Sequence, residues 1–184
     1  MTTYQFPQFP KQFPKNRLLQ KVKDSFVKRF LTDKASIRYL EEGFINATDI
    51  PFVRFIGIKE KEEVLSLDLK KNVCNHVETI HAAAQFTLAE TESGMRLQSL
   101  FPELEQKVIP LVRDAQIKYK KPAAQKITAH SFVDDKAIEK FKIQFGKKGR
   151  ALLQIRVEIR DIDDTLTSEA HITWFVQARL DEKA

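Results

Sequence analysis

Cysteine and histidine, the residues that most often crosslink or metallate a small domain, are scarce in this sequence. Its 184 residues include one cysteine, Cys74, and four histidines. A single cysteine cannot form an intramolecular disulfide, and no Cys/His cluster has the spacing of a structural zinc site. We therefore expect the hydrophobic core to hold the fold, with no metal and no cofactor.

Long hydrophobic runs are absent too. No uncharged apolar stretch approaches the roughly 18 residues that span a bilayer. The N-terminus shows neither the apolar core nor the small-residue cleavage site of a secretory signal peptide. We therefore expect a cytoplasmic protein, and the chain length suits one hydrophobic core.

Three glycine-containing motifs that mark common enzyme classes are also missing. The sequence has no Walker A pattern, no Gly-x-Gly-x-x-Gly and no Gly-x-Ser-x-Gly. The first two build phosphate-binding turns, and the third builds the nucleophile turn of serine hydrolases. Their absence removes the commonest nucleotide-binding and serine-hydrolase alternatives.

Positive charge is present but is concentrated at one end of the chain. The formal net charge is +6, and residues 1–30 contain seven basic residues against one acidic residue. This segment therefore accounts for the whole net charge, and the rest of the chain is balanced. A neutral body argues against a nucleic-acid partner, which normally requires a basic surface.

The first 43 residues form a separate predicted segment. Three Phe-Pro pairs within residues 6–14 favour an extended arm, because proline fixes φ and lacks an N–H. An amphipathic basic helix is predicted over residues 15–30, where apolar residues recur every four positions. A second short helix is predicted over residues 35–42, ending at Gly43.

The basic helix has two interpretations. Its apolar stripe packs on the body of the protein or on a partner subunit, or residues 15–32 contact an anionic membrane surface. We favour packing over the peripheral membrane contact. We expect residues 1–43 to be a helical extension and residues 44–184 to be the main domain.

Hydrophobic periodicity and turn residues predict the elements of this main domain. Strands are predicted over residues 52–58, 64–70, 108–120, 124–132, 153–160 and 169–179. A long helix is predicted over residues 79–100, and a shorter one over residues 134–145 with Asp134 or Asp135 as its cap. The first two strands form a hairpin about the polar turn at residues 59–62. One long helix against a strongly curved antiparallel sheet is an α+β architecture.

Glu90 stands out on the long helix. A helical wheel places it within roughly 40° of Phe86, Gly94 and other apolar or small residues, and opposite a polar side. That polar side consists of Gln85, Glu92, Arg96 and Ser99. Desolvation on an apolar face should raise the pKa of Glu90, which is common for functional carboxylates. The alternative is that Glu90 lies at an interface edge or pairs with a lysine.

A polar cluster, residues 75–81, leads into this helix. Free N–H groups at a helix start, followed by small residues, suit the binding of a carbonyl oxygen or an oxyanion. The structural alternative is that Asn75 and Thr79 cap the helix and His81 is a polar residue of its first turn.

Asn75, His81, the small pair Ala82-Ala83 and Glu90 have the spacing of a known signature. They resemble the Asn…His-Gly-Gly…Asp/Glu pattern of hotdog-fold acyl-CoA thioesterases of the PaaI type. With the Lys-Pro-Ala segment at residues 121–123, the sequence is more similar still to the thioesterase-like DUF4442 group. The resemblance covers roughly residues 44–180 and implies a hotdog fold, in which a curved sheet wraps a long central helix.

The resemblance also implies roles for these residues. Glu90 would act as general base for water or as nucleophile on the thioester carbonyl, and the N–H of Ala82 would bind the carbonyl oxygen. Asn75 of the opposite subunit would position water or the carboxylate, with His81 near the thioester. The implied partners are an acyl-CoA, with coenzyme A as part of the substrate, and a second copy in a homodimer; a tetramer is the alternative assembly.

The sequence departs from the family pattern at two places. Glu78 replaces a glycine three residues before the histidine, and Ala82-Ala83 replace the Gly-Gly pair. The simplest explanation of Glu78 is an acid in the first turn of the helix, where the dipole favours it. A non-catalytic acyl-CoA or acyl-chain binding protein is therefore the second hypothesis, and a hydratase or dehydratase the third.

Overall fold

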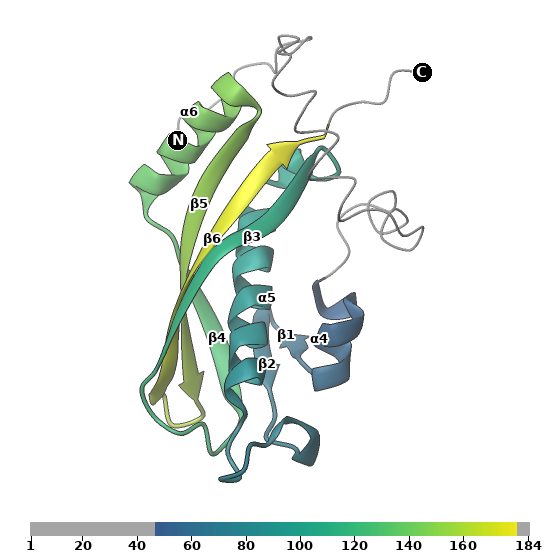
Figure 1. The fold of residues 1–184 in the computed structure, drawn as a ribbon, viewed down its shortest axis with the longest axis vertical. Helices are drawn as coiled ribbons and strands as arrows, with labels where there is room; N and C mark the ends of the chain where they lie inside the picture. Colours follow the sequence, from purple (N-terminus) through teal and green to yellow (C-terminus); the bar gives the residue numbers. More distant parts are fainter. Residues whose placement is uncertain (1–46, 180–184) are drawn as a thin grey trace.

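The computed structural model describes residues 47–179 of the chain (Figure 1). The predicted Phe-Pro arm, the helix over residues 15–30 and the helix over residues 35–42 lie outside the described residues. Within residues 47–179, no helix is long and apolar enough to cross a membrane.

The described chain forms a six-stranded antiparallel sheet and one long helix. The sheet order is β1-β2-β4-β5-β6-β3. The strands are β1 (Lys59–Lys61), β2 (Val64–Leu67), β3 (Val108–Tyr119), β4 (Ile127–Phe132), β5 (Arg150–Asp161) and β6 (Leu166–Ala178). The helices are η2 (Ala47–Asp49), α4 (Pro51–Ile56), η3 (Lys71–Val73), α5 (Ala82–Leu100), η4 (Pro102–Leu104) and α6 (Asp135–Lys148). Figure 1 shows the sheet curving around α5, which confirms the predicted α+β architecture.

The strongest sequence pattern, in β5 and β6, produces the centre of the core. Alternate residues of these strands face α5 and are buried: Leu153, Ile155, Val157, Ile159, Ala170, Ile172 and Val176. Their neighbours in sequence face the other side of the sheet and are more exposed. Burying one Val, Leu or Ile side chain contributes about 1.5–3 kcal/mol, so this inner face holds the sheet against the helix.

The strand predicted over residues 52–58 is wrong: the structure has a short helix, α4, at Pro51–Ile56. Pro51 occupies the first helical turn, where its missing N–H has no cost, and Gly57 ends the helix with a left-handed φ of 83°. Val53 and Ile56 are buried at helical spacing, whereas Phe52 and Phe55 are exposed.

The hairpin is also shifted from its predicted position. Lys59–Lys61, predicted as the turn, form the edge strand β1, which pairs with β2. Glu62 and Glu63 make the turn instead, both with positive φ, as a two-residue hairpin loop requires. Strand β4 begins at Ile127, three residues later than predicted.

Helix α6 follows the predicted capping. The side chain of Asp134 accepts a hydrogen bond from the Lys136 N–H, and Gly149 ends the helix in a left-handed conformation. Phe141 stacks on Phe101 at the end of α5, with ring centroids 4.5 Å apart. This contact places α6 against the far end of α5 and beside β5, away from the start of α5.

Candidate functional site

The middle of helix α5 is mostly buried, but one of its faces remains partly open. Phe86, Glu90 and Gly94 remain partly exposed along its middle, whereas Leu88 and Ala89 are fully buried. At 100° per residue, the three partly exposed residues and Ala83 lie within about 40° of Glu90. We call Ala83, Phe86, Glu90 and Gly94 the open face of α5.

The predicted polar side of α5 is only half correct. Arg96 and Ser99 are exposed, but Gln85 is 5% exposed and Glu92 is half-buried, because both point toward the sheet. The hydroxyl of Ser168 in β6 donates to Gln85 Oε1 over 3.0 Å, and that of Ser131 in β4 donates to Glu92 Oε1 over 2.7 Å. A helical wheel predicts that polar residues face solvent. Polar side chains can nevertheless be buried where a neighbouring strand supplies hydrogen-bond partners.

Glu90 differs from Glu92 in having no such partner. No described residue donates a hydrogen bond to the Glu90 carboxylate or forms an ion pair with it. Burial raises the pKa of this carboxyl above its ordinary value, as the wheel predicts. Within residues 47–179, the lysine partner of the structural alternative is therefore not found.

Glu92 borders a second feature, an open cavity of about 450 Å³ with both polar and apolar walls. Its lining also includes His130, Ser131 and Arg160. Burial raises the pKa of Glu92, although the Ser131 hydroxyl and the charges of His130 and Arg96 oppose the shift. The sequence signal for this site was weak, because its residues come from α5, β4 and β5.

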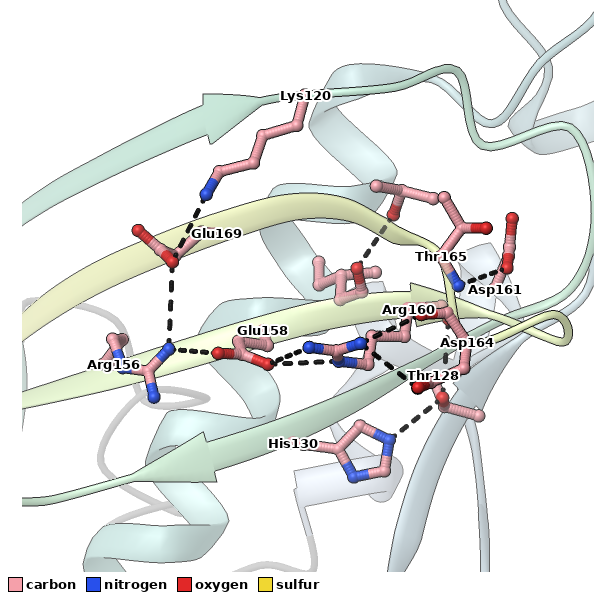
Figure 2. Close-up of polar contacts among 12 residues, drawn as sticks. Lys120, Thr128, His130, Arg156, Glu158, Arg160, Asp161, Asp164, Thr165 and Glu169 are labelled. Carbon is pink, nitrogen blue, oxygen red and sulfur yellow. Dashed lines mark hydrogen bonds and ion pairs between the residues drawn. The ribbon is translucent and has the colours of Figure 1, made fainter.

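His130, Ser131 and Arg160, three polar side chains of this cavity, already have partners in the fold. His130 and Ser131 are consecutive in β4 and point to opposite faces, so they do not form a Ser–His pair. His130 Nε2 lies 3.2 Å from Thr128 Oγ1, and Arg160 bonds Glu158 and Asp164 (Figure 2). The cavity therefore lacks an activated nucleophile and a free cation.

The outer face of the sheet carries a ladder of charged pairs. Glu158 lies between Arg156 and Arg160, and its hydrogen bonds to both hold its pKa below the ordinary value (Figure 2). Lys120 Nζ lies 3.5 Å from Glu169 Oε2. These pairs are structural and leave no charge aimed at the open face of α5.

His81, not Asn75 or Thr79, caps α5. Its Nδ1 accepts a hydrogen bond of 3.0 Å from the Ala83 N–H. The Ala82 N–H has no acceptor among the described residues. A side chain that the sequence did not reveal lies next to it: the Tyr119 hydroxyl, from the end of β3, donates to the Ala82 carbonyl over 3.0 Å.

Asn75 holds the loop before the helix. Its Oδ1 accepts from the N–H groups of Val77 and Thr79, both over 3.0 Å, and its Nδ2 donates to Thr79 Oγ1 over 2.8 Å. The carbonyl oxygen of this side chain is therefore occupied within its own loop, which leaves one amide N–H for other contacts.

Glu78 is not in the first turn of the helix, contrary to prediction. It lies four residues before Ala82, in the Asn75 loop, with a left-handed φ of 60°. Glycine adopts this conformation without strain, whereas a residue with a Cβ does not. The signature that this sequence resembles has glycine at this position, which avoids the backbone strain that Glu78 incurs.

The structure divides the predicted site residues into two groups. Asn75, His81 and Ala82 lie at the start of α5, and Glu90 lies eight residues further along the same helix. At 1.5 Å per residue, Ala82 and Glu90 are about 12 Å apart along the axis. A carbonyl group bound at the Ala82 N–H is therefore about two turns of the helix away from Glu90 of the same chain.

Comparison with known families gives one match. The model of the family DUF4442, a domain of unknown function, matches residues 51–176. No curated protein matches the chain.

Several solved structures resemble this one. A Pseudomonas aeruginosa protein of unknown function, described as a probable thioesterase, is 20% identical with a TM-score of 0.63, over 72% of this chain and 91% of that one. A Haemophilus influenzae thioesterase is 17% identical with a TM-score of 0.57, over 74% and 90%. A Bacillus halodurans protein solved with CoA is 16% identical with a TM-score of 0.55, over 89% and 93%. These likenesses show that the chain has the predicted hotdog fold.

The left-handed conformation of Glu78 gives the first prediction. Glu78→Gly should raise the free energy of unfolding by about 0.5–1 kcal/mol, because relief of left-handed strain outweighs the added entropy of the unfolded chain. Urea denaturation measures this. Glu78→Ala is the matched control, since it removes the charge and keeps the Cβ; equal stabilisation by both variants would contradict the backbone explanation.

The half-buried carboxyl of Glu90 gives the second prediction, which concerns the pH dependence of stability. Because its folded pKa is raised above 4.5, the unfolded chain ionises this group at lower pH than the folded chain does. Stability from this group is therefore complete below the unfolded pKa and decreases as the pH rises through the folded pKa. Glu90→Gln should be more stable than wild type at about pH 7 and nearly equal at about pH 4, by urea denaturation at both values. A variant less stable than wild type at neutral pH would contradict this.

Proposed function

Since this chain belongs to the DUF4442 family, we propose that it hydrolyses an acyl-CoA thioester at the open face of α5. Glu90 acts there as general base for water, or as nucleophile on the thioester carbonyl. The Ala82 N–H at the start of a second copy of α5 binds the carbonyl oxygen. The structural neighbours described as thioesterases support the same class of reaction.

One observation carries the proposal: the half-buried Glu90 carboxylate has no described partner, while Gln85 and Glu92 on the same helix are both paired. Burying a carboxylate without compensation costs stability, so a functional use accounts for it better than a structural one. The raised pKa also makes the Glu90 carboxylate a stronger base than an exposed glutamate.

In the reaction, the Glu90 carboxylate removes a proton from water as the water oxygen attacks the thioester carbonyl. The negative charge that develops on the carbonyl oxygen is stabilised by the Ala82 N–H and by the positive end of the α5 dipole. Collapse of the tetrahedral intermediate breaks the C–S bond. The proton held by Glu90 then passes to the departing thiolate, so that a carboxylic acid and a thiol leave and Glu90 is ionised again.

The separation of about 12 Å along α5 favours a site formed by two chains. Strand β3, at the end of the sheet, supports such an assembly. It has twelve residues and pairs only with β6 among the described residues. A long unpaired edge strand is a natural surface for antiparallel pairing with a second copy. We therefore propose a homodimer in which each site combines Glu90 of one chain with the α5 start of the other.

We place the coenzyme A portion of the substrate by its negatively charged phosphate groups. Lys121 lies two residues after Tyr119, whose hydroxyl lies on the α5 start, and it forms no ion pair with a described residue. It can meet a phosphate group as a point charge. The Bacillus halodurans structure with CoA adds support for this ligand class.

Acyl binding without turnover is the second candidate, and one observation favours it. The Ala83 N–H is already bonded to His81 Nδ1, so the α5 start offers a single free donor, that of Ala82, among the described residues. Acyl-CoA would then raise the Tm without releasing thiol. Hydratase or dehydratase chemistry stays a third hypothesis and predicts double-bond chemistry in place of thiol release.

The role of Glu90 is tested with Glu90→Gln, which keeps the shape and removes the base. The rate of thiol release over a panel of acyl-CoA chain lengths should fall roughly 10²- to 10⁴-fold, as for the loss of a general base. Glu92→Gln is the matched control, because Glu92 lies on the same helix and bonds Ser131; its rate should change little. An unchanged rate in Glu90→Gln excludes this residue as the catalyst.

A pH profile adds a second readout for Glu90. The base acts only when ionised, so kcat/KM of the wild type should decrease as the pH falls through a pKa above 4.5. A profile that stays flat down to that value would contradict the assignment.

The role of Ala82 is tested with Ala82→Pro. Proline at the first helical position keeps the helix and removes only the N–H, and the extended His81 that precedes it (ψ 142°) accepts a following proline. We expect a roughly 10²- to 10³-fold lower kcat with little loss of stability.

The two-chain site makes a further prediction for these variants. Mixed dimers of Ala82→Pro and Glu90→Gln contain one intact site, because the two substitutions then fall in the same site and spare the other. Activity should therefore return on mixing the two inactive proteins after unfolding and refolding together. No recovery, with mixed dimers shown by mass, would place both groups in one chain.

A further inference from the structure

We infer that the Trp174 indole is the end wall of the acyl site and restricts the enzyme to short acyl groups. This specificity role rests on the proposed function, because it takes the open face of α5 as the site of the thioester. In this proposal, one side chain of β6 determines which acyl chain lengths the site accepts.

Trp174 is fixed against α5 by two contacts. Its Nε1 donates to Ser93 Oγ over 3.0 Å, and Ser93 Oγ in turn donates to the Glu90 carbonyl oxygen over 2.8 Å. A Cβ built at Gly94 would lie 3.3 Å from Trp174 Cζ2, so the six-membered ring lies directly on this glycine. The close approach favours glycine, because a Cβ there would fit only if the indole moved by a few tenths of an ångström.

These contacts place the indole across the open face. On the wheel, Ser93 and Gly94 lie on either side of the direction of Glu90, about 60° and 40° from it. Gly94 is four residues after Glu90, about 6 Å further along the helix. The ring therefore spans the face one turn beyond the carboxylate, toward the C-terminal end of α5.

The polarity of α5 gives the direction of the acyl chain. In the two-chain site the thioester carbonyl lies between Glu90 and the α5 start of the second copy. Toward its own start, α5 ends in the polar Ala82 N–H and Tyr119 hydroxyl, which do not suit an acyl chain. Beyond Glu90 the open face leads to Gly94 and Trp174, and buried Leu97 follows. An acyl chain running toward this apolar end meets the indole after about one helical turn, which leaves room for only a few carbons.

Trp174 is the only tryptophan of the chain, so its emission reports on this wall directly. The full-length Glu90→Gln protein is titrated with CoA, acetyl-CoA, butyryl-CoA and lauroyl-CoA, with binding measured by calorimetry. Butyryl-CoA should change the emission at the concentration at which it binds, and CoA alone should not. Butyryl-CoA that binds and leaves the emission unchanged overturns the inference and leaves the proposed function intact. If no acyl-CoA binds, both fail.

Chain-length selection is tested by turnover. Wild type should have a higher kcat/KM for butyryl-CoA than for lauroyl-CoA. Trp174→Ala should raise kcat/KM for lauroyl-CoA relative to butyryl-CoA by at least roughly tenfold, because it removes a wall that excludes several methylenes. Trp174→Phe, which keeps an aromatic ring in the core, should shift the preference in the same direction and covers the case in which the alanine variant does not fold.

Phe175→Ala is the matched control. Phe175 is the next residue of β6, points to the opposite face of the sheet and lies 6.0 Å from the Arg113 guanidinium. Its loss should leave the chain-length preference of wild type unchanged. The inference is overturned if wild type prefers lauroyl-CoA, if neither Trp174 variant alters the preference, or if Phe175→Ala alters it equally.

Discussion

Helix α5 can lie against the sheet because the polar side chains that it turns toward the strands find partners there. Ser168 satisfies Gln85, Ser131 satisfies Glu92, and Ser93 accepts the Trp174 N–H. An unpaired polar group at these depths would cost about 1–3 kcal/mol, so the helix and strands must keep their register for these contacts to form. The rest of the structure depends on this register, including the position of α6 and the loop before α5.

The same packing makes Glu90 an exception. It is half-buried and shares a helix with paired polar residues, yet no described residue neutralises it, and its pKa is raised. Stability would favour a neutral side chain at this position. Retaining a carboxylate there at a cost in stability is typical of functional groups. The left-handed backbone of Glu78 also lowers the stability of the fold, and this residue lies in the loop that positions His81 at the helix start.

Helical geometry sets what this carboxylate can do. An α-helix separates Glu90 from the Ala82 N–H by about 12 Å along its axis, which favours the proposed site that combines Glu90 with the α5 start of a second chain. It also places the Trp174 ring against Gly94, one turn beyond Glu90. The proposed assembly and the proposed limit on substrate size thus both rest on positions along one helix.

The sequence by itself determined the α+β architecture, the long helix, the β5 and β6 strands and the partial burial of Glu90 beside Phe86 and Gly94, because periodicity reports which residues share a face. It misplaced residues 52–58, where Pro51 and Gly57 favour a helix over the strand, and assigned Gln85 and Glu92 to solvent. Only the tertiary structure decided that Ser131 and Ser168 pair with them, that His81 caps α5, and that Tyr119 and Trp174 lie on it. Those partners are distant in sequence, and no local pattern records a contact between residues that only the folded chain brings together.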